Sequence, residues 1–306
     1  MPSKTLHSFH SIAEYHRFRG LPAPAHPLIS VIDMASLPTV KGEGEVNLVF
    51  DFYSIALKRM LNAKMKYGQQ QYDFDEGVLF FMAPGQIFGI EVEKDKVLEH
   101  SGWMILIHPN FLWNTSLAGT IRQYDYFNYS VHEALFLSEL EEATLLRLIG
   151  TIHQEHLNNI DRFTQDILIA QLELLLSYAD RYYHRQFLTR KITNHQVLSQ
   201  LETLLTDWFN SPDLTTKGLP TVQSVAEALH LSPTYLSSLL KVLTGQTTQQ
   251  HIHNKLLEKA KQILSTTQLS VSEIAYELGF EHPQSFSKLF KAKTQLSPLK
   301  FRQSFN

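Results

Sequence analysis

The sequence predicts an α+β fold in two domains, with a β-rich N-terminal domain, a helical segment after it and an all-α C-terminal domain. Two observations support this prediction. Short runs of β-branched and aromatic residues recur between residues 21 and 130. The C-terminal end instead has helical periodicity, in two similar copies. With 306 residues, the chain is long enough to bury a core in each domain.

The N-terminal part is expected to form a β-sandwich or a small barrel. Its strand-like runs are residues 29–32, 46–50, 53–57, 78–82 and 103–107. Turn signals separate these runs, as in Lys41-Gly42-Glu43-Gly44 and Ala83-Pro84-Gly85-Gln86. Many short strands with few helical patterns are typical of both architectures.

Helices are expected over residues 138–187. Ser138 and Glu141 form a capping-box signature at the start of the first helix. The second helix begins near Asp161, and its apolar residues cover more than half of its circumference: Ile167, Leu168, Leu172, Leu175, Leu176 and Ala179. Such a helix needs two partners. One is the β-domain, and the other is either a helix of the same chain or the same helix of a second subunit.

Linkers are expected at residues 186–196 and 210–220, on either side of a short helix over residues 197–209. Beyond them a motif occurs twice. The first copy reads Val225-Ala226-x-x-Leu229-His230-Leu231, then Leu236-x-x-x-Leu240-Lys241, and the second reads Ile274-Ala275-x-x-Leu278-Gly279-Phe280, then Phe286-x-x-x-Phe290-Lys291. The offset is 49 residues in the first half and 50 in the second, so the later copy has one extra residue in its turn. Each copy has the pattern of a helix-turn-helix.

The longer helix of each copy is expected to be amphipathic. The inward-facing residues are Leu236, Leu239, Leu240 and Leu243 in the first copy, and Phe286, Leu289 and Phe290 in the second. The outward-facing stripes are Thr234, Ser237, Ser238 and Lys241, and Gln284, Ser287, Lys288 and Lys291. In the first copy, the outward stripe is displaced from the inward stripe by two residues, which is about 200° of helix rotation.

The segment between the copies also suits two neighbouring binding sites on DNA. Within residues 247–267, one apolar stripe is formed by Ile252, Leu256, Leu257, Ala260, Ile263 and Leu264. About 20 helical residues span about 30 Å. Successive major-groove faces lie about 34 Å apart. Residues 220–306 hold nine basic and five acidic residues, a net charge of +4, whereas the whole chain has −3. A basic C-terminal end is what phosphate binding requires.

The run SVSEIAYELGFEHPQSFSKLFKAKTQLSPLKFRQ (270–303) contains the pattern IA…GF, then S.F…FK, then SP…R. On these residues, the part from about 195 to 306 resembles the AraC/XylS family of bacterial transcription regulators. The family usually has a glycine before the Ser297-Pro298 turn, where this chain has Gln295 and Leu296. Lys255 stands where the linker helix often has an arginine.

The resemblance implies three parts: a cupin-like effector-binding domain (1–135), a helical dimerisation segment (136–190) and a double helix-turn-helix DNA-binding domain (195–306). Residues 74–91 look like the central hairpin of the first part. The implied partners are promoter double-stranded DNA, an unidentified small-molecule effector, RNA polymerase and a second copy of the chain. We expect the interface of that homodimer at residues 161–183.

The resemblance also implies the contacts to DNA. The base-facing positions are Thr234, Ser237 and Ser238 in the first unit, and Gln284, Ser285, Ser287 and Lys288 in the second. Lys241 and Lys291 end the two outward stripes and are expected to contact phosphates. Arg302 is expected to be structural, because the matching arginine of the family lies near the end of the C-terminal helix.

Several classes of protein are excluded or disfavoured. The chain has no cysteine, which excludes disulfides and zinc–thiolate sites. Of its 15 histidines, only His251 and His253 form a His-x-His pair, and on a helix these point about 200° apart. No metal, cofactor or enzymatic activity is expected. Without a signal peptide or a run of about 20 apolar residues, a soluble cytoplasmic protein is expected.

The leading hypothesis is a transcription regulator that responds to a small effector. Two alternatives stay open: a cupin enzyme with an accessory DNA-binding module, and a regulator whose β-domain serves only for dimerisation. The sequence does not indicate which aromatic residues of the β-domain contact an effector.

Overall fold

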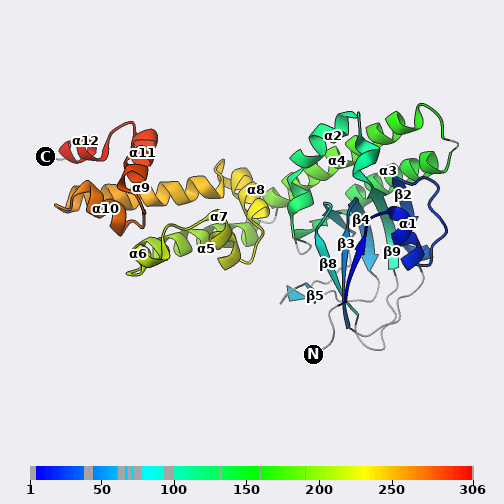
Figure 1. Cartoon of the computed structure of the whole chain (residues 1–306), viewed down its shortest axis with the longest axis horizontal. Helices are drawn as coiled ribbons and strands as arrows, with labels where there is room; N and C mark the ends of the chain where they lie inside the picture. The colour runs from blue at the N-terminus through cyan, green and yellow to red at the C-terminus, as the bar shows by residue number, and fades with distance from the viewer. Residues whose placement is uncertain are drawn as a thin grey trace. The chain divides into compact units, whose positions relative to one another are not determined.

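The structure, a computed structural model, describes residues 5–37, 44–60, 66–67, 70–71, 77–92, 100–130, 133–158, 160–189 and 191–304. The chain divides into two compact units, Met1–Gln186 and Phe187–Asn306. The N-terminal unit combines sheets with helices, and the C-terminal unit is helical (Figure 1). The predicted two-domain α+β class is confirmed at this level.

The strands of the N-terminal unit form two main sheets, with the orders β1-β3-β8 and β10-β7-β4-β9-β2. Their bounds are β1 Thr5–Phe9, β2 Ile29–Asp33, β3 Gly44–Phe50, β4 Tyr53–Met60, β7 Val78–Met82, β8 Ile87–Val92, β9 His100–Ile107 and β10 Leu135–Phe136. The short strands β5 (Lys66–Tyr67) and β6 (Gln70–Gln71) pair with each other. Each of the predicted strand runs lies inside one of these strands.

The turn at residues 83–86 does not close a hairpin, so the expectation for residues 74–91 is wrong. β7 pairs with β4 and β10, whereas β8 pairs with β3, and the turn therefore carries the chain from one sheet to the other. The Gly85 N–H donates to the Phe50 carbonyl over 2.8 Å, which fixes the turn against β3. Among the described strands, the two sheets are not joined into a closed barrel.

Alternation along β4 separates two cores, because successive side chains of a strand point to opposite faces. Ala56 faces a cluster that includes Leu48 and Phe50 of β3. Ile55 and its β7 partner Phe81 lie on the other face, where Phe81 packs against Tyr183 of α4. Figure 1 shows α3 and α4 on this side of the five-stranded sheet. The cluster around Ala56 thus lies between the two sheets.

The helices of the N-terminal unit are α1 (Ile12–Phe18), α2 (Ser116–Thr120), α3 (Glu139–Leu157) and α4 (Thr164–Thr189). The predicted capping box at α3 is confirmed: the Glu141 N–H donates to Ser138 Oγ, and the Ser138 N–H donates to the Glu141 carboxylate. This arrangement satisfies two amides that the first turn of a helix leaves free.

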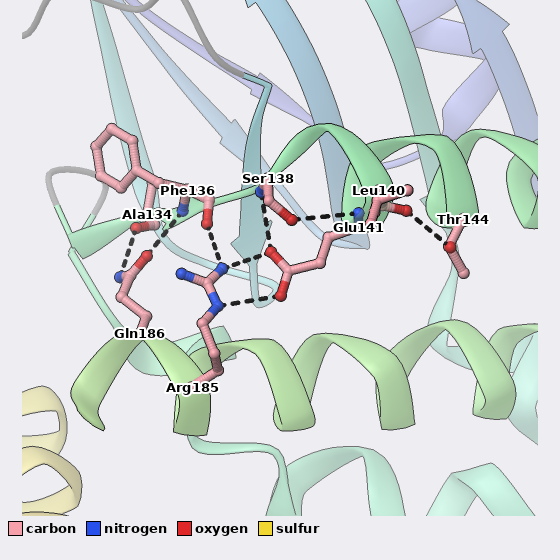
Figure 2. Close-up of polar contacts among 8 residues, drawn as sticks. All are labelled: Ala134, Phe136, Ser138, Leu140, Glu141, Thr144, Arg185 and Gln186. Atoms are coloured by element: carbon pink, nitrogen blue, oxygen red, sulfur yellow. Dashed lines mark hydrogen bonds and ion pairs between the residues drawn. The ribbon is translucent and has the colours of Figure 1, made fainter. Parts of the chain in front are cut away.

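A network of polar contacts ties the end of α4 to β10 and to the start of α3 (Figure 2). The Arg185 guanidinium lies 2.6 Å from the Glu141 carboxylate and also donates to the Phe136 carbonyl over 2.8 Å. The Gln186 side chain accepts from the Phe136 N–H and donates to the Ala134 carbonyl. The edge strand β10 therefore has its free backbone groups satisfied by α4 side chains.

The apolar surface of α4 is divided between buried and exposed residues. Leu175 is completely buried within a single chain, together with other apolar residues of the helix: Leu168, Leu172, Leu176 and Ala179. Leu174, by contrast, is 47% exposed, and Phe163 and Ile167 are exposed as well. Leu175 is therefore a core residue of its own subunit.

The C-terminal unit consists of α5 (Lys191–Asn210), α6 (Leu214–Lys217), α7 (Val222–Ala228), α8 (Pro233–Thr244), α9 (Thr248–Thr266), α10 (Val271–Glu277), α11 (Pro283–Thr294) and α12 (Pro298–Gln303). The linker expected at residues 186–196 is wrong, because α4 continues to Thr189 and α5 begins at Lys191. One buried cluster connects α5 to α11, with Leu201, Leu236, Leu256 and Phe290 among its members.

Four left-handed residues occupy matching positions in the two repeats. The first copy has His230 (φ +56°) in its turn and Gly245 (φ +75°) after its long helix. The second has Gly279 (φ +82°) and Gln295 (φ +64°) at these places. The left-handed conformation strains residues with a Cβ but not glycine. Each copy therefore carries one relaxed and one strained left-handed residue.

We expect Gln295→Gly to stabilise the end of α11 by about 0.5–1 kcal/mol, the strain relieved less the extra entropy of an unfolded glycine. Amide hydrogen exchange of residues 286–296 in the full chain should slow accordingly. The matched control is Gly245→Ala, which places a Cβ at the equivalent left-handed position of the first copy and should speed exchange at the end of α8. Exchange that is unchanged or faster in Gln295→Gly would show that the residue is not strained.

Candidate functional site

Two helix-turn-helix units are present where the repeat predicted them. α7 and α8 form the first, and α10 and α11 form the second, with residues 229–232 and 278–282 between the helices. The second turn is one residue longer, as the offsets required. The helix starts are fixed by their own side chains: Ser232 Oγ accepts from the Tyr235 N–H, and Ser270 with Glu273 forms a capping box.

The inward faces of α8 and α11 belong to one buried core that also includes the apolar side of α9. Leu236 and Leu240 are fully buried, and so are Phe286 and Phe290, while Leu243 and Leu289 are partly buried. The linker helix α9 begins after its N-cap Thr247 and ends at Thr266. It has 19 residues, which corresponds to about 28 Å at 1.5 Å per residue. The predicted linker helix is therefore confirmed.

The opposite faces carry the residues expected to contact DNA. Lys241, Gln284, Ser285, Lys288 and Lys291 are exposed, and Thr234, Ser237, Ser238 and Ser287 are partly buried. In the described part of the chain, no acidic side chain forms an ion pair with any of the three lysines. Their charges are available to an anionic partner. The second unit thus presents longer and more exposed polar side chains than the first.

Two polar residues of the C-terminal unit, Ser237 and Arg302, have contacts within the protein. The Ser237 hydroxyl lies 3.0 Å from the hydroxyl of Thr248, a fully buried residue at the start of α9. Arg302 donates to the Leu264 carbonyl over 3.2 Å and to the Leu269 carbonyl over 2.7 Å. The structural role predicted for Arg302 is confirmed, since it joins α12 to the end of α9. The contact of Ser237 with α9 has no sequence signal.

The N-terminal unit contains a cavity between its two sheets. It has about 40 Å³ of space for the centres of water-sized molecules, which is room for a few waters or for part of a small ligand. Most of its wall is apolar, but Arg19, at the end of α1, and Lys58, on β4, also line it. Neither Arg19 nor Lys58 is among the site residues expected from the sequence. Lys58 follows Ser54 and Ala56 at alternate positions of a strand, and this pattern alone places it inward.

Burial, together with the nearby positive charge of Arg19, lowers the pKa of Lys58 to about 8. The Lys58 ammonium lies over two aromatic rings, 5.0 Å from the centre of Phe88 and 5.5 Å from that of Phe80. These rings partly compensate its lost hydration. Among the described residues, no group of three His, Asp or Glu side chains is arranged to hold a metal ion.

Two helix-turn-helix units that share one linker helix and one core define a double helix-turn-helix DNA-binding domain. Residues 225–304 match the family model of a helix-turn-helix domain. The uncharacterized transcriptional regulatory protein YesN of Bacillus subtilis is 37% identical over 109 residues, covering 35% of this chain and 28% of YesN. The C-terminal unit is thus a helix-turn-helix domain of the AraC family, as the resemblance predicted.

Two further comparisons concern more of the chain or a solved structure. The uncharacterized HTH-type transcriptional regulator YfiF of Bacillus subtilis is 21% identical over 238 residues, covering 78% of this chain and 72% of YfiF. The solved C-terminal domain of the two-component response regulator yesN from Fusobacterium nucleatum is 30% identical, with a TM-score of 0.31, covering 35% of this chain and 98% of that one. The chain spans less than a third of Bacillus YesN, so that likeness identifies the domain and not the activity of the whole chain.

Proposed function

We propose that the chain is a sequence-specific DNA-binding transcription regulator of the AraC type. The observation that carries this proposal is the pair of helix-turn-helix units on the single helix α9, each with a polar outward face. The length of α9, about 28 Å, suits two recognition helices that enter successive major grooves on one side of the duplex. The partner is promoter double-stranded DNA, and the protein acts in the cytoplasm, where bacterial promoters lie.

The outward residues divide into two roles under this proposal. Gln284 and Lys288 read base edges, because glutamine pairs bidentately with adenine and lysine reaches guanine acceptors. Thr234, Ser237, Ser238, Ser285 and Ser287 have short side chains, and they contribute closer or water-mediated contacts. Lys241 and Lys291 contact phosphates and contribute affinity without sequence preference. The second unit therefore supplies more of the specificity than the first.

We expect Gln284→Ala to relax the preference at one base position and to cost about 1–3 kcal/mol of affinity for the preferred site. Its side chain is exposed, so the substitution should leave the fold intact. Selection of bound sequences from a random DNA library, with wild type and variant in parallel, measures both effects. Gln262→Ala, an exposed glutamine on α9, is the control and should change neither. An unaltered preference in Gln284→Ala would contradict the assignment.

The N-terminal unit is proposed to be a cupin-like domain that binds a small effector. The cavity between its two sheets supports this proposal, because it combines an apolar wall with a few polar groups, as ligand sites do. Binding there would alter affinity for the promoter or contact with RNA polymerase. No helix in the described part of the chain is long and apolar enough to cross a membrane.

A homodimer is also part of the proposal, with its interface in the exposed part of the predicted segment 161–183. Exposed apolar residues recur here at helical spacing: Phe163 just before α4, and Ile167 and Leu174 on it. A second copy of the same helix would cover this stripe in a two-fold arrangement. Two chains would then bring four helix-turn-helix units to a pair of half-sites.

A further inference from the structure

The cavity of the N-terminal unit has a chemical character that narrows the class of its ligand. Its wall is formed by alternate residues of β4, by the inner faces of β3, β7, β8 and β9, and by α1. The aromatic rings on this wall are Tyr15, Phe50, Phe80 and Phe88. Three methionines, Met34, Met82 and Met104, line it as well. Methionine side chains are flexible, so this wall can adjust to the shape of an apolar group.

Two positive charges, those of Lys58 and Arg19, face this apolar space. Neither Lys58 nor Arg19 forms an ion pair with an acidic side chain in the described residues. Arg19 donates from Nη1 to the Tyr15 hydroxyl over 3.5 Å, a long contact. Its Nη2 is buried and has no hydrogen-bond acceptor among the described residues. A buried charged donor without an acceptor is destabilising, so the site favours a ligand that brings one.

The few polar groups of the wall limit what that ligand can be. Apart from the two cations, the described lining residues offer only the side-chain hydroxyls of Tyr15 and Ser54. The Tyr15 hydroxyl already donates to Met104 Sδ over 3.7 Å. A sugar would bury many hydroxyls that this wall could not pair, which is costly. A carboxylate, in contrast, accepts from a guanidinium and an ammonium together and leaves the rest of the ligand to apolar contacts.

We propose that this cavity binds a small monocarboxylic acid with an apolar body, whose carboxylate is held between Lys58 and Arg19. The inference rests on the proposed effector-binding function and names the chemical class of the effector. The apolar body lies against the aromatic and methionine side chains between the two sheets. The carboxylate supplies the acceptor for Arg19 Nη2 and compensates the charge of Lys58.

Binding should depend on pH in a defined direction. Lys58 is charged below its pKa of about 8 and neutral above it. A bound carboxylate stabilises the charged form and raises this pKa, so binding is coupled to uptake of a proton above pH 8. Affinity should therefore stay level between about pH 6 and 7, where the ligand is fully ionised, and fall as the pH rises beyond 8. Replacement of Lys58 by a neutral residue should remove this dependence.

The test uses the full chain and two matched pairs of probes: phenylacetate with phenylacetamide, and hexanoate with hexanamide. We expect at least one acid to bind at least tenfold tighter than its amide in isothermal titration calorimetry, and to raise the melting temperature. Lys58→Met keeps an unbranched apolar side chain and should abolish the preference for the acid. Arg19→Met should do the same, whereas Lys217→Met and Arg147→Met, which replace exposed cations, should not.

Each remaining outcome is also informative. Equal binding of acid and amide, a preference that survives in both Lys58→Met and Arg19→Met, or no binding of either acid at millimolar concentration would overturn the inference. Affinity of the same protein for its selected DNA site is measured separately, with and without acid. Acid binding that leaves DNA affinity and transcription unchanged would support the site but contradict the proposed effector function. If the protein binds its DNA site but does not bind either acid, the proposed DNA-binding function stands and only the assigned ligand class is wrong.

Discussion

Leu175→Glu is expected to unfold the N-terminal unit instead of producing a folded monomer. Leu175 has no exposed surface in a single chain, so a carboxylate there would be buried without a partner. Substitutions of this kind belong to the small group that costs more than about 4 kcal/mol. Circular dichroism and limited proteolysis of the full chain should show loss of the strands and helices of this unit.

The adjacent residue provides the control. Leu174 is 47% exposed on the same helix, so Leu174→Glu should leave the fold intact. If the exposed stripe of α4 is the dimer interface, sedimentation of this variant should show a folded monomer. A folded dimer in Leu174→Glu would contradict the proposed interface, and a stably folded Leu175→Glu variant would contradict the burial of Leu175 by its own subunit.

The second large effect is expected for Phe290→Ala, at about 3–5 kcal/mol of destabilisation. Phe290 is fully buried and packs against Phe286 at 5.7 Å and Phe301 at 5.4 Å, measured between ring centres. Its loss leaves a void between α11 and α12 and weakens the support of the second recognition helix. Hydrogen exchange of core amides in α9 to α11 should become faster by a corresponding factor.

Affinity for DNA should fall together with this stability, because a recognition helix that moves on its core cannot hold its side chains against base edges. Tyr276→Ala is the control, since Tyr276 is an aromatic residue of the same unit with 53% of its surface exposed. It should change stability by no more than about 0.5 kcal/mol. Unchanged exchange in Phe290→Ala would show that Phe290 does not support the unit.

The C-terminal domain was predictable because several local signals agree there. Leu236 and Leu240 recur with the same spacing as Phe286 and Phe290, and the capping residue Ser232 precedes the first of the two helices. Two copies in register make a chance pattern improbable. The same local signals fail at Lys191, where α5 begins, because polar residues at the start of a helix resemble those of a linker. The extent of a helix then depends on tertiary packing, which local pattern does not record.

The surface of α4 shows a second limit of sequence analysis. Periodicity indicates how wide an apolar surface is, but it does not show which part the same chain covers. Leu175 and Leu174 are both leucines in one helix, and only the fold separates the buried one from the exposed one. The hairpin expected across Gly85 failed for a similar reason. Each strand beside this turn finds a better partner elsewhere in the sequence, in β4 and in β3.

The ligand cavity could not be predicted from the sequence, because its charged residues come from segments that are far apart in the chain. Arg19 follows α1, and Lys58 lies on β4, so only the folded sheets bring them to one space. A basic residue at an inward strand position, such as Lys58, is a usable signal on its own. It indicates either a buried ion pair or a site for an anion. The absence of an acidic partner for it among the described residues is visible only in the structure.

The most direct test of the central claim is a hydroxyl-radical footprint of the full chain on a DNA site selected from a random library. The two helix-turn-helix units should protect two patches on one face of the duplex, separated by one helical turn of about 10–10.5 base pairs. Gln284→Ala should weaken protection in the patch read by the second unit and leave the other in place. A single patch, or protection that does not depend on DNA sequence, would contradict a regulator that reads two neighbouring major grooves.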